Sequence, residues 1–125
     1  CSFAPIFIFL IDIFLLNSYD VEDSGPVVAH IFAHRDEYRN KQVLCGGYYT
    51  TMEEIAAAIA RVTGKTVVYK QSGIPEGTPQ EFIDTFRLFN EYGYYNGEDI
   101  GEAQRIHPSM KSFEEWLREA GVFVD

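Results

Sequence analysis

The apolar and polar positions divide the chain into an almost continuous hydrophobic run, residues 3–16, and a body with periodic patterns. As a helix, the fourteen residues of this run would rise about 21 Å, less than a bilayer core of about 30 Å, so we expect no membrane span. Because the run is rich in Ile and Phe, a buried strand or a short core helix is the expected structure. A secretory leader stays open as an alternative, although no Lys or Arg precedes Arg35.

Four segments of the body have the apolar spacing and the terminal signals of helices. Thr51, Thr78 and Ser112 each stand three residues before a glutamate, which is the spacing of a capping box. A glycine follows the second and the fourth segment at the position of a helix C-cap. The predicted helices cover residues 24–36, 52–63, 79–92 and 112–120.

The third predicted helix is strongly aromatic. Phe82, Phe86 and Phe89 fall on one stripe at helical spacing. We expect Phe86 and Phe89 to pack in the core.

Two segments of the body have the composition of strands. They are residues 42–45, which precede Gly46-Gly47, and residues 66–71, which are β-branched and aromatic. A strand, a helix and a second strand indicate an α/β fold, in which the sheet needs more strands than the body supplies. We therefore expect an incomplete sheet flanked by helices, whose unpaired edges favour a homodimer or aggregation of the isolated chain.

Composition and charge narrow the classes of partner. The 125 residues, 46% hydrophobic and 23% charged, have the balance of one globular domain. Nineteen acidic residues against ten basic ones give a net charge of −9, which opposes phosphate backbones, so no direct nucleic-acid contact is expected. Two cysteines, Cys1 and Cys45, suit a reducing compartment, and the expected location is the cytoplasm, with the nucleus as an alternative.

The order of motifs along the body resembles a known family. Residues 20–71, DVEDSGPVVAHIFAHRDEYRNKQVLCGGYYTTMEEIAAAIARVTGKTVVYKQ, contain an Asp-x-x-Asp-x-Gly-Pro start of a helix and a later Thr-x-x-Glu start of the next. Residues 99–121, DIGEAQRIHPSMKSFEEWLREAG, contain an Asp-Ile, a His-Pro and a Trp-Leu helix. This succession, over residues 19–121, resembles the middle-to-late portion of NmrA-like proteins, atypical members of the short-chain dehydrogenase/reductase superfamily. It divides the chain into an apolar leader, residues 1–18, and an NmrA-like C-terminal region, residues 19–125.

The resemblance implies a partial Rossmann-like unit that follows a dinucleotide-binding half. Full-length members of the family bind NADP or NAD and include NAD(P)H-dependent oxidoreductases and redox-sensing regulators. This sequence contains no Gly-x-Gly, which a pyrophosphate cradle needs, and no Tyr-x-x-x-Lys. We therefore expect no cofactor-binding and no catalytic residues in this chain alone, and whether the parent protein is an enzyme stays open.

In the family, the corresponding C-terminal portion covers a substrate or partner cleft. Tyr92, Tyr94 and Tyr95 follow one another closely and cannot all face one way, so at least one hydroxyl should reach a cleft or the surface. Tyr48 and Tyr49 stand in the turn before the second helix. We predict that these five tyrosines line a cleft for a small-molecule substrate or a protein partner.

Other candidate residues have simpler structural explanations. His30 and His34 have a metal-compatible spacing, but their helical angle places them beside the apolar stripe, so we expect solvated histidines and no metal site. Gly46-Gly47 before a helix could admit an anion, although a plain strand-to-helix turn explains the pair as well. Cys45 is expected to be a small core residue.

Two functional interpretations remain open. In the first, the chain is the C-terminal substrate- or partner-binding part of an NmrA-like NAD(P)-binding protein. In the second, it is a free-standing, non-enzymatic protein-interaction module.

Overall fold

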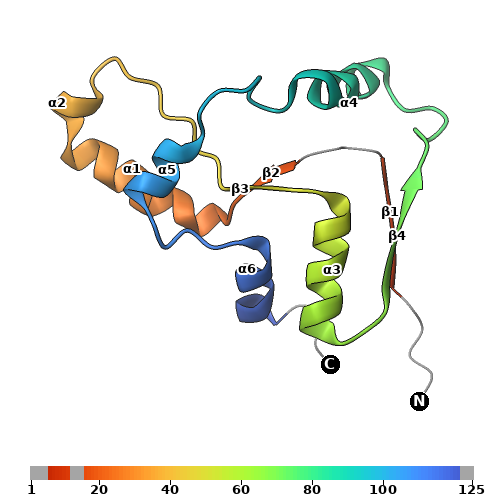
Figure 1. The fold of residues 1–125 in the computed structure, drawn as a ribbon. Coiled ribbons are helices and arrows are strands. Elements are labelled where there is room, and N and C mark those ends of the chain that lie inside the picture. Colours follow the sequence, from red (N-terminus) through yellow and green to blue (C-terminus); the bar gives the residue numbers. More distant parts are fainter. Residues whose placement is uncertain (1–5, 12–15, 122–125) are drawn as a thin grey trace.

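A computed structural model describes residues 6–11 and 16–121, and these residues form a mixed helix–strand fold (Figure 1). Helices predominate, and the strands are short. The elements in chain order are β1 (Ile6–Ile11), β2 (Leu16–Ser18), the 3-10 helix η1 (Val21–Asp23), α1 (Ser24–Ala33), α2 (Arg35–Tyr38), β3 (Tyr48–Thr50), α3 (Met52–Thr63), β4 (Val67–Ser72), α4 (Gln80–Tyr92), α5 (Gly101–Ile106) and α6 (Phe113–Ala120).

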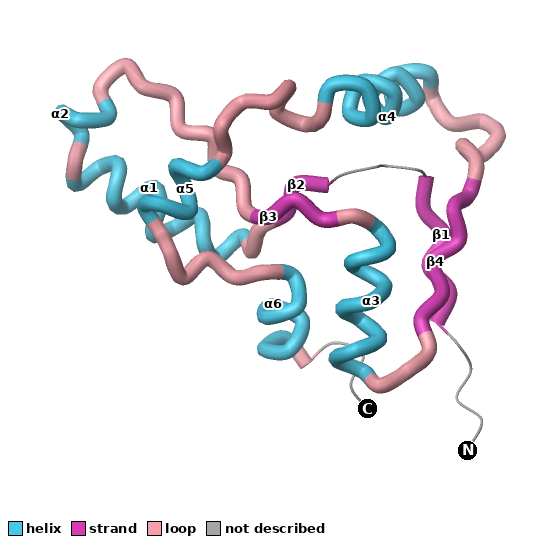
Figure 2. The backbone as a smooth tube through the Cα atoms, in the orientation of Figure 1, coloured by secondary structure: helices cyan, strands magenta, loops and turns pink. Residues whose placement is uncertain are grey.

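The strands form two separate pairs within the described chain. β1 runs parallel to β4, with Ile6 opposite Val67, and β2 runs antiparallel to β3, with Ser18 opposite Tyr48. Helix α3 packs against both β4 and α6, so it lies between the parallel strands and the last helix (Figure 2). The strand interpretation of the apolar run is confirmed at Ile6–Ile11, whereas positions 3–5 and 12–15 of that run lie outside the described residues.

The strand predicted at residues 42–45 is wrong. Residues 41–47 have no regular secondary structure, and the strand is β3, immediately after the two glycines. The physical reason is strand pairing, because β2 forms its hydrogen-bonded ladder with Tyr48–Thr50. Val43 and Cys45 instead pack against the core beside α1. The apolar composition of residues 42–45 therefore reflects their packing against the core and not a β-strand.

The caps of α3 and α6 agree with the sequence pattern. The Thr51 side chain accepts from the Glu54 N–H while the Glu54 carboxylate accepts from the Thr51 N–H, and Ser112 and Glu115 form the same box. The glycines after both helices, Gly64 and Gly121, adopt left-handed conformations with φ of 68° and 61°.

Three features of the helices differ from the prediction. Helix α4 has the expected length, but Thr78 does not cap it: the Thr78 hydroxyl donates to the Pro75 carbonyl oxygen at 2.7 Å, and Pro79 occupies the N-cap position. The predicted single helix of residues 24–36 breaks at His34 into α1 and α2. Helix α5, in a region predicted as loop, has no side-chain cap, so it lacked a terminal signal in the sequence.

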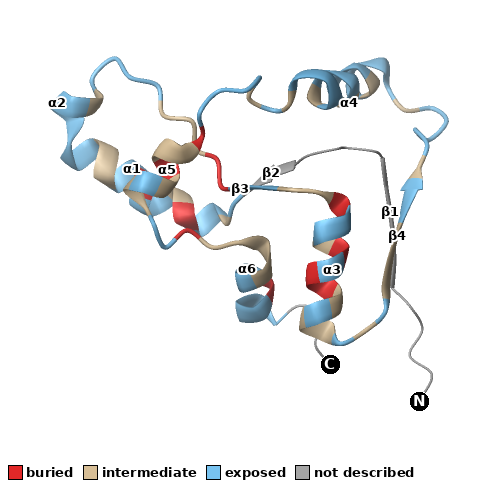
Figure 3. Ribbon diagram, viewed as in Figure 1, coloured by how far each residue is buried: buried red, intermediate tan, exposed pale blue. Residues whose placement is uncertain are grey.

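The core has two parts, one between α1 and α5 and one between α3 and α6 (Figure 3). Val27, Ala103 and Met110 form one buried cluster, and half-buried Ile31, Val43, Cys45 and Ile106 pack against it. The buried side chains of the α3–α6 contact include Ile59 and Leu117. The prediction that Cys45 is a core residue is consistent with this position.

The expectation that Phe86 and Phe89 are core residues is wrong. None of the residues of α4, all of which are described, is buried, and Phe82 is 54% exposed. The helix lies along the upper edge of the molecule in Figure 1, away from α3 and α6, so its aromatic stripe is only partly covered.

Among the described helices, none is long and apolar enough to cross a bilayer.

Candidate functional site

The pairing of β2 with β3 brings distant tyrosines to one place. Because Ser18 lies opposite Tyr48, the next residue, Tyr19, lies beside the segment that carries Cys45. The Tyr19 phenol lies close enough to the Cys45 side chain and to Tyr94 to interact with both electrostatically. No sequence signal pointed to Tyr19, since its position depends on the pairing of two three-residue strands.

The chain after α4 returns to the same place. The Tyr95 hydroxyl donates to the Cys45 carbonyl oxygen at 3.3 Å, and the Tyr94 and Tyr95 rings meet edge to face with centroids 4.8 Å apart. Phe89 of α4 contacts the Tyr94 ring, with centroids 4.9 Å apart. Tyr49 lies close enough to Tyr95 to interact electrostatically with its phenol. We call the set Tyr19, Cys45, Tyr49, Tyr94 and Tyr95 the tyrosine cluster.

Two phenols of the cluster, those of Tyr19 and Tyr95, have raised pKa values. Burial raises the pKa of Tyr19, and the neighbouring Cys45 and Tyr94 raise it further. Burial is also the first cause that raises the pKa of Tyr95, followed by Tyr94 and the other ionisable side chains of the cluster. Because the Tyr19 and Tyr95 phenols keep their protons at neutral pH, neither supplies a phenolate base. The Tyr95 O–H is already donated to the Cys45 carbonyl oxygen, so the cluster mainly offers flat aromatic surface.

The other two tyrosines predicted for the cleft lie elsewhere. Tyr48 is next to Tyr49 on β3 and faces the opposite side, as strand neighbours do, where its hydroxyl donates to the Met110 carbonyl oxygen at 3.1 Å. Tyr92 is the last residue of α4 and is 52% exposed. The structure therefore brings Tyr49, Tyr94 and Tyr95 together and leaves Tyr48 and Tyr92 apart from them.

An open cavity of about 450 Å³ adjoins the tyrosine cluster. Its size is that of a small-molecule pocket. Its walls combine aromatic rings with carboxylates, and the Asp99 carboxylate accepts the Gly101 N–H and pairs with Arg105 at 2.9 Å. These contacts, the Gly101 bond first, lower the pKa of Asp99, so it stays charged at neutral pH. The lining residues are Gln42, Leu44, Tyr94, Tyr95, Glu98 and Asp99.

The glycine pair and the histidine pair that the sequence offered as candidate sites have structural roles. Gly46 and Gly47 are buried, and the Gln104 side chain donates to the Gly47 carbonyl oxygen, which is consistent with the turn interpretation. His30 and His34 stack with ring centroids 4.1 Å apart, and His34 Nδ1 lies 2.9 Å from the His30 carbonyl oxygen. Within residues 6–11 and 16–121, no group of three or more His, Cys, Asp and Glu side chains could hold a metal ion.

Comparisons with known proteins define the family and the fold. The NmrA-like family matches residues 12–117 of this chain. Among solved structures, a mutant form of NmrA with two substitutions to glycine aligns with a TM-score of 0.67 at 20% identity, over 95% of this chain and 43% of that one. NmrA, a negative transcriptional regulator, in complex with NAD aligns with a TM-score of 0.64 at 19% identity, over the same shares of the two chains.

A third structure, NmrA in complex with NADP, aligns with a TM-score of 0.64 at 19% identity, again over 95% of this chain and 43% of NmrA. The chain thus spans less than half the length of these solved relatives, and its fold matches part of theirs. At this identity the structures establish the fold, and the sequence match establishes the family. The chain therefore belongs to the NmrA-like family.

Proposed function

We propose that this chain is the C-terminal, substrate- or partner-binding part of an NAD(P)-linked NmrA-like protein, in which another segment holds the dinucleotide. The observation that carries the proposal is the family match over residues 12–117, together with the alignment of nearly all of this chain to 43% of NmrA. The parent would be a redox-sensing regulator or an NAD(P)H-dependent oxidoreductase. We retain the division into an apolar leader, residues 1–18, and an NmrA-like region, residues 19–125, as part of this proposal.

The solved complexes of NmrA contain NAD and NADP, and we propose one of these for the parent of this chain. The chain itself has no Gly-x-Gly to let backbone N–H groups approach a pyrophosphate. Its contribution is the tyrosine cluster and the adjoining cavity of about 450 Å³. There, the rings of Tyr94 and Tyr95 offer flat aromatic surface and the carboxylates of Glu98 and Asp99 accept hydrogen bonds, an arrangement that suits a small polar substrate or a side chain of a protein partner.

Titration of the purified chain with NADPH, followed by nicotinamide fluorescence, tests this assignment. We expect no saturable change, while an NmrA relative that binds NADP gives one under the same conditions. Tight binding of one NADPH per chain would overturn the proposal, because this polypeptide would then contain the dinucleotide site itself.

A second candidate is a free-standing protein-interaction module, and the exposure of α4 favours it. Phe82, Leu88 and Tyr92 are each more than half exposed, which gives this helix apolar surface for a partner. The coding sequence upstream distinguishes the two candidates. A strand, a glycine-rich loop and a helix encoded in frame would favour the first, and their lack together with an isolated, folded chain would favour the second.

A further inference from the structure

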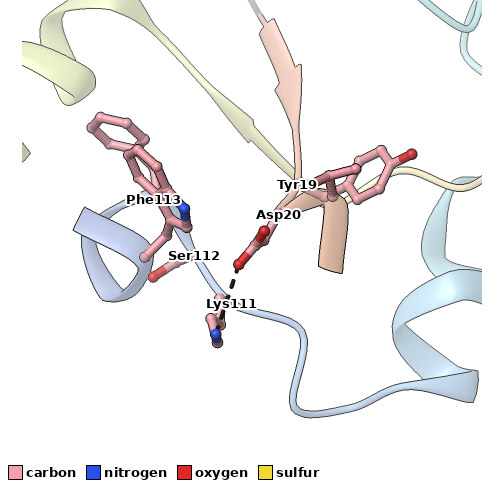
Figure 4. A pocket seen from close by; sticks show the side chains of 7 residues that line it. Tyr19, Asp20, Lys111, Ser112 and Phe113 are labelled. Atoms are coloured by element: carbon pink, nitrogen blue, oxygen red, sulfur yellow. Dashed lines mark ion pairs between the residues drawn. The ribbon is translucent and has the colours of Figure 1, made fainter. Parts of the chain in front are cut away.

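A groove separate from the cavity beside Glu98 and Asp99 lies between η1 and α6. It consists of two adjoining cavities of about 310 and 360 Å³, both lined by Asp20, Val21, Lys111 and Trp116. Figure 4 shows Tyr19 and Asp20 on one side and Ser112 and Phe113 on the other, with the Tyr19 hydroxyl directed away from Phe113. Segments from opposite ends of the sequence thus form its two walls.

The walls of the first cavity are largely aromatic. Phe113 and Trp116 are nearly parallel, with an interplanar angle of 27° and centroids 6.0 Å apart. Trp116 is 37% exposed and Tyr19 is 40% exposed, so both present ring surface to a ligand. The quadrupole of an aromatic ring makes its face partially negative, so the face attracts organic cations.

A buried carboxylate, that of Asp20, lines both cavities. The Asp20 side chain is only 7% exposed, and its Oδ2 lies 3.7 Å from Lys111 Nζ, which is a long ion pair. Lys111 Nζ lies much closer to Glu119, at 2.6 Å, and this contact is the first cause that raises the pKa of Lys111. The single ammonium of Lys111 is therefore shared between Glu119 and the more distant Asp20, whose Oδ1 also accepts the Glu22 N–H at 3.1 Å. Two carboxylates thus face one ammonium, which leaves an excess of negative charge beside the rings.

The charges around the whole groove are predominantly acidic. Among the described residues that line it are three carboxylates, those of Asp20, Glu22 and Glu119, and one cation, Lys111. The chain as a whole carries a net charge of −9. An anionic ligand would meet three carboxylates, and a hard metal ion would find one buried carboxylate among aromatic rings in place of the oxygen cage it needs. A cation with an apolar body satisfies both the rings and Asp20.

We propose that the groove between η1 and α6 binds an organic cation, a quaternary ammonium or a guanidinium, whose apolar surface lies against Trp116 and Phe113 and whose charge faces Asp20. The same chemistry is carried by a small amine and by an arginine side chain of a peptide. The site goes beyond the proposed function, because it uses neither the dinucleotide nor the cavity beside Glu98 and Asp99.

The test uses Trp116, the only tryptophan in the sequence, as the reporter. The intact chain is titrated with choline and with 3,3-dimethylbutan-1-ol, which has the same shape without the charge, and KCl keeps the ionic strength constant. We expect a saturable change in Trp116 fluorescence with choline and an affinity about tenfold weaker for the neutral alcohol. Equal affinities for the two compounds, or no response to choline, would overturn the proposal.

Asp20→Asn tests the carboxylate, since Asn keeps the side-chain acceptor for the Glu22 N–H. We expect it to weaken choline binding about tenfold, whereas Asp36→Asn, which removes the same charge from an exposed side chain on α2, leaves the affinity unchanged. An equal loss in both variants would refute a specific site. Far-UV circular dichroism checks folding, and the comparison of choline with its neutral analogue in the unmodified chain decides the question if Asp20→Asn is unfolded.

A short peptide with one central arginine, measured in the same way, identifies the source of the cation. Tighter binding of the peptide than of choline assigns the groove to a protein side chain, and tighter binding of choline assigns it to a small molecule. Benzoate is the opposite probe, and a higher affinity for this anion than for choline would contradict the proposal.

Discussion

His107 Nε2 lies 2.9 Å from Asp23 Oδ1, which joins the loop before α6 to the start of α1 across 84 residues of sequence. The other oxygen of Asp23 accepts the Lys111 N–H at 2.9 Å. Asp23 is only 5% exposed, so both of these contacts are shielded from solvent. One carboxylate thus fixes the loop that carries Lys111 and Ser112 into the groove beside Trp116.

Removal of this carboxylate should destabilise the fold. Asp23→Ala leaves the Lys111 N–H and the His107 ring without their acceptor, and we expect the free energy of unfolding to fall by about 2 kcal/mol. Asp23→Asn should lose less, because its amide can still accept from Lys111 and donate to His107. Urea denaturation measures both variants. Asp36→Ala, at a 77% exposed side chain, is the control with an expected change below about 0.5 kcal/mol, and an equal effect at the two positions would argue against the role of Asp23.

The capping box of α6 predicts a loss of stability in acid. Hydrogen bonds from Ser112, the backbone N–H first, lower the pKa of Glu115 below its ordinary value of 4.5. Since the folded state binds this proton less readily than the unfolded chain, the contribution of Glu115 is complete above pH 4.5 and disappears as the pH falls through the folded-state pKa. Glu115→Gln should therefore be less stable than the original chain at neutral pH and equal to it in strong acid. Thermal unfolding at a series of pH values measures the difference, and a difference independent of pH would contradict the assignment.

The tyrosine cluster predicts delayed ionisation in alkali. Burial raises the pKa values of Tyr19 and Tyr95, so their phenols should ionise above the ordinary value of 10.0. Ultraviolet absorbance at increasing pH should show a late component, and Tyr95→Phe should reduce its amplitude. The chain in concentrated urea is the control, because every phenol is then solvated. A late component that persists unchanged in urea would show that the delay does not come from the folded cluster.

Local signals account for the elements that the sequence predicted well. Each capping motif involves only one helix and its flanking residues, namely the boxes of Thr51 and Ser112 and the glycines after α3 and α6. These motifs can therefore be predicted without knowledge of the rest of the chain. The parallel strand β4 was recognisable from its β-branched residues. The resemblance to NmrA-like proteins came from the succession of such signals, and the family match over residues 12–117 agrees with it.

Contacts between distant segments account for what the sequence did not predict. The prediction of a strand at residues 42–45 was wrong because β2 pairs with Tyr48–Thr50. Tyr19 was overlooked because it is this same pairing that places it beside Cys45. The pair Asp23–His107 likewise joins residues whose separation hides them from any local pattern. The sequence and the family resemblance predicted one cleft lined by five tyrosines, Tyr48, Tyr49, Tyr92, Tyr94 and Tyr95. The structure gathers three of these, Tyr49, Tyr94 and Tyr95, through long-range contacts that no local pattern shows.

Exposed apolar surface on α4 predicts self-association of the isolated chain. Leu88 and Tyr92 lie one turn apart and are 53% and 52% exposed, and β1 pairs with β4 as its one partner in the described chain. Burial of this surface and pairing of the strand edges both favour a dimer. Sedimentation velocity over a wide concentration range should show association that Leu88→Lys weakens, while Val28→Lys, at an exposed position of α1, does not. Association unaffected by Leu88→Lys would assign the contact to the sheet edges, and a monomer at every concentration would show that neither surface drives assembly.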